Sequence, residues 1–114
     1  MRGYDPATGK YSTSTVTAVK VVTTNNMLIV NTEAGTPLRV DASPTEILWT
    51  QLNDGTTVWL SVTQLKVGDS LFTQDGWVPV TSIEFALGGT HVMYDITATV
   101  PYFANGYLDP PHPS

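Results

Sequence analysis

The chain of 114 residues contains no cysteine. A disulfide framework, a thiolate zinc site and a cysteine nucleophile are therefore excluded within it. Charged residues make up 13% of the chain, which is about half of the usual share of about 25%. Ten acidic and five basic residues give a net charge of −5. We therefore expect no nucleic-acid partner, because binding a phosphate backbone requires clustered Lys and Arg.

Long apolar runs and helical periodicity are also missing. No run approaches the roughly 20 apolar residues of a membrane span, and no signal-peptide pattern comes after Met1, so we expect no membrane partner. No stretch repeats apolar residues at the spacing of a helix over three turns. The chain is instead rich in threonine and valine, with 18 and 13 residues, and both types favour strands.

Turn signals divide the chain into β-rich runs, at intervals of about 8–12 residues. The predicted turns are Asn25-Asn26, Glu33–Gly35, Asn53–Gly55, Val67–Asp69, Asp75-Gly76 and Gly88-Gly89. This punctuation predicts one all-β domain, of the sandwich or barrel-like kind, over residues 1–108. Residues 109–114 are predicted to form an extended, proline-rich tail.

The sequence also resembles itself. Val16-Thr17-Ala18-Val19 and Val80-Thr81-Ser82-Ile83 each come after a turn with Asp and Gly and then an aromatic residue. Either the chain contains an internal repeat, or two hairpins are alike by chance. The second copy is preceded by Gln64–Asp69, whereas only Met1–Gly3 precede the first. If the repeat is real, we expect the chain to begin within its first half.

Few residues are candidates for catalysis or for metal binding. His91 comes after a glycine turn and is expected to be a solvated surface residue, while His112 lies among the prolines of the tail. We expect no metal site and no cofactor, because two distant histidines do not converge and no nucleotide-binding or metal motif is present. We also assign no catalytic residue. Aspartates beside turns are predicted to cap them; these are Asp41, Asp54, Asp69, Asp75 and Asp95.

The tryptophans Trp49, Trp59 and Trp77 allow two interpretations. They could line a groove that binds a peptide or a sugar. In a β domain of this size, however, tryptophans are more often core residues or stack across a hairpin, and we favour that structural role.

Three segments resemble the Hint domains, the Hedgehog/intein family. Tyr94–Leu108, with Y-D-I and then F-A-N-G, resembles the last block of that family. Leu65–Leu71 is similar to its L-x-V-G-D-x-L segment, and Gly3–Lys10 resembles the stretch after its first G-D-x-V. The resemblance covers nearly the whole chain. It implies an all-β horseshoe of short antiparallel strands with a pseudo-two-fold repeat, and a role in protein autoprocessing, by splicing or cleavage.

The resemblance also shows where the chain departs from the family. Hint chemistry begins with an N-terminal Cys or Ser that attacks the preceding peptide bond, and this residue would lie upstream of Met1. The activating His of the T-x-x-H block would fall in Val40–Pro44. Alignment on the proline places Ser43 there, and alignment on the first position, through Asp41, places Pro44.

The terminal block departs in the same way. Val100 or Pro101 stands where the family has its second His. The terminal His-Asn pair, whose Asn cyclises to release the C-terminal flank, is replaced by Asp109-Pro110. Asn105 resembles a turn residue and not the cyclising asparagine.

These departures favour a non-catalytic Hint-like module with a structural or interaction role. One alternative is the larger C-terminal piece of a split or truncated autoprocessing domain that needs a short N-terminal companion segment. A second alternative is a small β binding module. An open strand edge where the first strands belong would recruit that companion or a second copy of the chain.

Overall fold

The computed structural model describes residues 2–35, 37–43, 46–104 and 106–110, which form antiparallel β-structure and one short 3-10 helix, η1 (Val62–Gln64). The strands are β1 (Arg2–Asp5), β2 (Lys10–Thr13), β3 (Val16–Thr32), β4 (Leu38–Asp41), β5 (Ile47–Gln51), β6 (Thr57–Ser61), β7 (Ser70–Thr73), β8 (Gly76–Ala98), β9 (Tyr102–Ala104) and β10 (Tyr107–Asp109). The predicted all-β class is confirmed. The predicted domain boundary at Leu108 falls inside β10, whose last residue is Asp109.

The strands join in the order β2-β1-β9-β10-β7-β8-β3-β4, and the β5–β6 hairpin attaches to β7. The molecule is flat, with extents of 40 × 34 × 22 Å. Four predicted turns are confirmed. Glu33–Gly35 lies between the paired strands β3 and β4, and Val67–Asp69 contains Gly68 with a positive φ angle of 99°. Asn53–Gly55 connects β5 to β6, and Asp75-Gly76 connects β7 to β8, with positive φ angles of 90° at Gly55 and 112° at Gly76.

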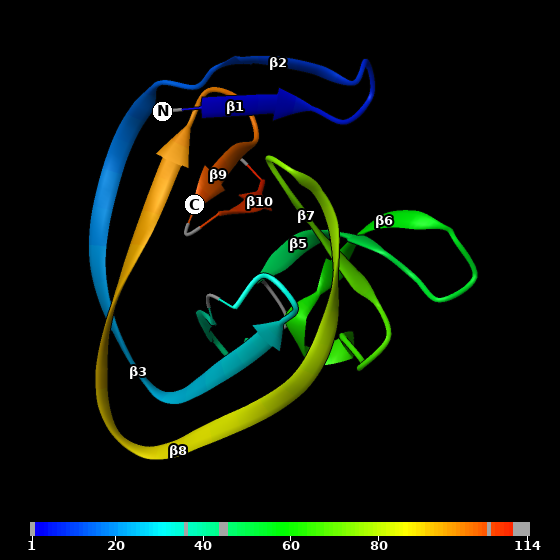
Figure 1. Ribbon diagram of the computed structural model, residues 1–114. Coiled ribbons are helices and arrows are strands. Elements are labelled where there is room, and N and C mark those ends of the chain that lie inside the picture. Colours follow the sequence, from blue (N-terminus) through cyan, green and yellow to red (C-terminus); the bar gives the residue numbers. More distant parts are fainter. Residues whose placement is uncertain (1, 36, 44–45, 105, 111–114) are drawn as a thin grey trace.

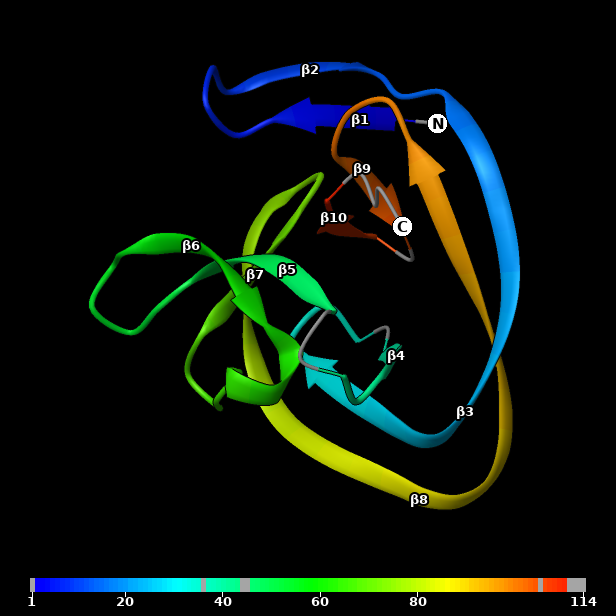
Figure 2. The same ribbon diagram turned by 180° about the vertical axis from the view of Figure 1, so that it is seen from behind.

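The long strands β3 and β8 pair with each other and form a curved ribbon around one side of the molecule (Figures 1 and 2). The turns predicted at Asn25-Asn26 and Gly88-Gly89 are therefore wrong, because both pairs lie inside these strands. The pairing is irregular at this point, with a register shift between Thr24, which pairs with His91, and Asn26, which pairs with Leu87. Local turn residues were overridden here by pairing between segments that lie far apart in the sequence.

The register of this ribbon is symmetric. In one half the pairs are Val16↔Ala98, Val19↔Ile96 and Val21↔Tyr94, and in the other they are Val80↔Thr32, Ile83↔Val30 and Phe85↔Leu28. Each half contains one bulged residue, Thr17 in β3 and Thr81 in β8, at the same place in the two similar tetrapeptides. The two halves of the ribbon therefore have similar registers.

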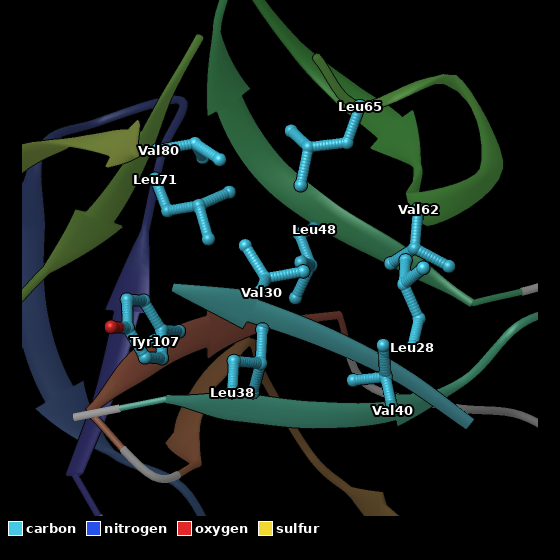
Figure 3. Close-up of a cluster of buried hydrophobic side chains, with 10 residues drawn as sticks. All are labelled: Leu28, Val30, Leu38, Val40, Leu48, Val62, Leu65, Leu71, Val80 and Tyr107. Carbon is cyan, nitrogen blue, oxygen red and sulfur yellow. The ribbon is translucent and has the colours of Figure 1, made fainter. Parts of the chain in front are cut away.

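The main core lies against only one half of the ribbon. Ten residues make up this cluster: Leu28, Val30, Leu38, Val40, Leu48, Val62, Leu65, Leu71, Val80 and Tyr107 (Figure 3). Val30 and Leu71 are fully buried, and the hydroxyls of Tyr107 and Thr32 lie 2.7 Å apart in a buried hydrogen bond. The β5–β6 hairpin and η1 supply the residues that cover Leu28, Val30 and Val80.

Candidate functional site

The first stretch that the resemblance singles out, at the end of β4, is tied to β3. The Asp41 carboxylate accepts a hydrogen bond of 2.6 Å from the Thr24 hydroxyl, and the Ala42 amide donates to the Asn26 carbonyl. The Ser43 amide donates to the Asp41 carbonyl at 2.8 Å, which closes a tight turn. Pro44 lies outside the described residues. Asp41 therefore has a structural role, as the hydrogen-bond acceptor of Thr24.

His91 is placed differently from the sequence-based expectation. It pairs with Thr24 across the ribbon, and its Nε2 atom is buried without a hydrogen-bond partner among the described residues. The prediction of a solvated surface histidine is wrong for this atom. The pairing brings an imidazole next to Thr24, the residue that donates to Asp41. No local signal in the sequence could have found this neighbourhood, because 67 residues separate the paired strands at this point.

The second stretch, Val100-Pro101 before β9, is held by hydrogen bonds from the N-terminal part of the chain. The Ser14 hydroxyl, which is almost fully buried, donates to the Val100 carbonyl at 2.8 Å, and the Tyr4 amide donates to the Pro101 carbonyl at 3.0 Å. A Cβ atom at Gly3 would come within 2.8 Å of the Val100 side chain, so β1 approaches this stretch closely. Neither Val100 nor Pro101 carries a group that can transfer a proton.

The third stretch ends β10 with Asp109, which pairs with Tyr102. Burial raises the pKa of the Asp109 carboxyl well above its ordinary value, and the negative charge of Glu46 raises this pKa further. A carboxyl has no amide nitrogen that could attack the backbone carbonyl, so Asp109 cannot cleave the chain by the side-chain cyclisation of an asparagine. Asn105 and His112 lie outside the described residues.

Aromatic side chains gather in a second cluster. The Trp49 and Trp59 rings are cross-strand neighbours with centroids 5.1 Å apart, and Trp77 lies 5.0 Å from Phe72. All three tryptophans are half-buried and pack against a group of buried residues, which are Phe72, Phe103 and Leu108. The predicted stacking of the tryptophans across hairpins is confirmed.

The described residues were also searched for metal-binding clusters and for membrane-spanning helices. Within the part of the chain that the structure describes, no group of three or more His, Asp or Glu side chains is arranged to hold a metal ion. No helix among the described residues is long and apolar enough to span a membrane.

Comparison with known proteins shows which solved structures share this fold. No family model matches the sequence, and no curated protein matches it. Solved structures do match. The PabCDC21-1 intein superposes with a TM-score of 0.78 at 19% identity over 97% of this chain and 68% of its own. The bacterial intein-like domain from Clostridium thermocellum gives 0.77 at 18% identity, over 96% of this chain and 78% of that domain.

An intein from a hyperthermophile gives 0.77 at 16% identity, over 96% of this chain and 69% of its own. At these identities the likeness is one of fold. The chain has the intein-like Hint fold: an antiparallel β-structure wrapped by one long, bent ribbon.

Proposed function

We propose that this chain is a Hint-fold module of the autoprocessing class that no longer carries out splicing or cleavage and serves as a structural or interaction domain. The observation that carries the proposal is the set of residues at the family's catalytic positions. Ser43 or Pro44 replaces the first histidine, Val100 or Pro101 the second, and Asp109-Pro110 the terminal His-Asn.

The local structure supports this proposal with a specific chemical reason. An acyl shift needs a group that moves a proton to and from the scissile peptide bond. At the end of β4 the Asp41 carboxylate is already the acceptor of the Thr24 hydroxyl. Before β9 the side chains are those of Val100 and Pro101. The Pro101 carbonyl accepts a hydrogen bond from the Tyr4 amide of β1, and the Val100 carbonyl accepts one from the Ser14 hydroxyl. Neither stretch supplies a proton-transfer group from the expected position.

The test places the chain between two reporter domains at neutral pH. We expect electrophoresis to show the intact fusion alone after prolonged incubation, with no scission or ligation product. The same fusion carrying His91→Ala is the matched control, because His91 is the imidazole near the first stretch. A specific product that disappears in the His91→Ala fusion would contradict the proposal and would assign catalysis to His91.

A second candidate function, an autoprocessing piece that requires a companion segment, is favoured by the unequal covering of the ribbon. Leu48, Val62 and Leu65 cover the half with Val80, which is 2% exposed. The corresponding residue of the other half, Val16, is 39% exposed. Nothing equivalent to Ile47–Leu65 covers that half among the described residues. A separate segment with the same strand–turn–strand pattern would fit there.

The test of this second candidate uses a synthetic segment that begins with Cys, has the strand–turn–strand pattern of Ile47–Leu65 and carries an N-terminal reporter. On mixing with the chain, the companion role predicts a thioester that dithiothreitol cleaves, with release of the reporter. A segment beginning with Ala is the control and should release nothing. No reporter release from the Cys segment would contradict the companion role.

A further inference from the structure

We propose that a second copy of this chain pairs with the outer edge of β3 over Val16–Val22, forming an antiparallel, two-fold symmetric dimer with Val19 at the axis. The edge is available because β3 pairs with β8 along its length but with β4 only over Met27–Val30. From Val16 to Thr24 this edge therefore pairs with no described strand. In both views the ribbon here forms the outer margin of the molecule, with no element beyond β3 (Figures 1 and 2).

The exposed apolar side chains of the chain are concentrated on the same ribbon. Of the seven large apolar side chains that are exposed among the described residues, five lie on β3 and β8: Val16, Val19, Val21, Phe85 and Val92. Val19 and Val21 are 58% and 61% exposed. A two-stranded ribbon is marginal without a third strand or a covering layer. An added strand would supply both hydrogen-bond partners and apolar contacts.

The edge carries limited protection against strand addition, with one bulge at Thr17 and one charge at Lys20. Natural edge strands are blocked by prolines, charges or bulges that face the solvent. Residues 15–23 contain no proline, and Lys20 is their one charged residue. No acidic residue occurs between Asp5 and Glu33, so two copies that each carry a net charge of −5 meet here with little repulsion.

Charge selects one register. An axis at Val19 pairs Val16–Val22 of the two copies, within the free edge Val16–Thr24. It places Lys20 opposite Ala18 of the second copy, and Val21 opposite Thr17. An axis at Lys20 would set two lysines against each other, which destabilises a cross-strand pair. β8 carries the acidic residue Glu84, so β3 is the edge with less repulsion.

The first experiment compares two valines of similar exposure by sedimentation velocity over a concentration series. We expect a concentration-dependent dimer for the unmodified chain. Val19→Lys places two lysines at the axis and should abolish the dimer, whereas Val67→Lys, at a valine that is 57% exposed on a different segment, should leave it intact. A monomer at all concentrations, an open-ended polymer, or equal loss in both variants would overturn the proposal.

The second experiment uses the absence of cysteine. Opposite residues in an antiparallel pair have Cα atoms about 4.5–5.5 Å apart, within the range of about 4.4–6.8 Å that a disulfide spans. Mild oxidation of Val19→Cys should therefore give a covalent dimer, and Val67→Cys should remain monomeric under the same conditions. Equal cross-linking of the two variants, or none in either, would overturn the Val19 axis even if Val19→Lys failed to fold.

Discussion

Leu28→Ala is expected to lower the free energy of unfolding by about 2–5 kcal/mol, the usual cost of emptying part of a packed core. Leu28 is 1% exposed and belongs to the cluster beneath the β5–β6 hairpin. The measurement is denaturant unfolding at a concentration where the chain is monomeric. The reason for the large effect is that η1 and β5 leave the neighbouring side chains little freedom to collapse into the cavity.

Val21→Ala is the matched control on the same strand. Val21 is 61% exposed, and its loss should change the free energy of unfolding by no more than about 0.5 kcal/mol. The pair of variants measures whether one half of the ribbon is covered and the other bare. Similar destabilisation by both substitutions would contradict the asymmetry of the core.

Asp109→Asn is expected to stabilise the chain at neutral pH, because the half-buried Asp109 carboxyl has to ionise in surroundings that disfavour its charge. Burial and the charge of Glu46 raise the pKa of Asp109 in the folded state. The stability that this carboxyl contributes is therefore fully present below the unfolded pKa of about 3.9 and is lost as the pH rises through the folded pKa. Asparagine cannot ionise and avoids that loss.

The measurement is the free energy of unfolding of both proteins from pH 3 to pH 8. Their curves should meet at the acid end and separate as the pH rises. Asp54→Asn is the control with the opposite sign. The backbone amide of Thr56 donates to the exposed Asp54 carboxylate and lowers the pKa of Asp54, so its contribution is lost as the pH falls. A constant difference between Asp109→Asn and the unmodified chain at every pH would contradict an Asp109 carboxyl whose pKa is raised by folding.

Local patterns predicted the local parts of this fold. The Asn53–Gly55 and Asp75-Gly76 turns are correct because each connects strands that pair directly with each other, β5 with β6 and β7 with β8. Gly88-Gly89 carries a similar turn signal. It failed because the strand around it pairs with β3, a segment more than 60 residues away at this point. Single-sequence patterns hold no information on such a long-range pairing.

The candidate site shows the same division. The candidate positions near the C-terminus could be named from the sequence, because the resemblance of Tyr94–Leu108 to the last block of the family leads to Val100 or Pro101 and to Asp109. Their surroundings could not. The contact between Thr24 and Asp41, the buried nitrogen of His91 and the raised pKa of Asp109 all depend on strands that meet only in the folded chain.

The central claim is that this chain keeps the Hint fold without its acyl-transfer chemistry. Intact-mass spectrometry of the chain with a reporter domain at each end, monitored over days at neutral pH, tests it most directly. We expect a single species at the mass of the full fusion. Two fragments whose masses define one cleaved bond, or a ligated pair of reporters, would contradict it.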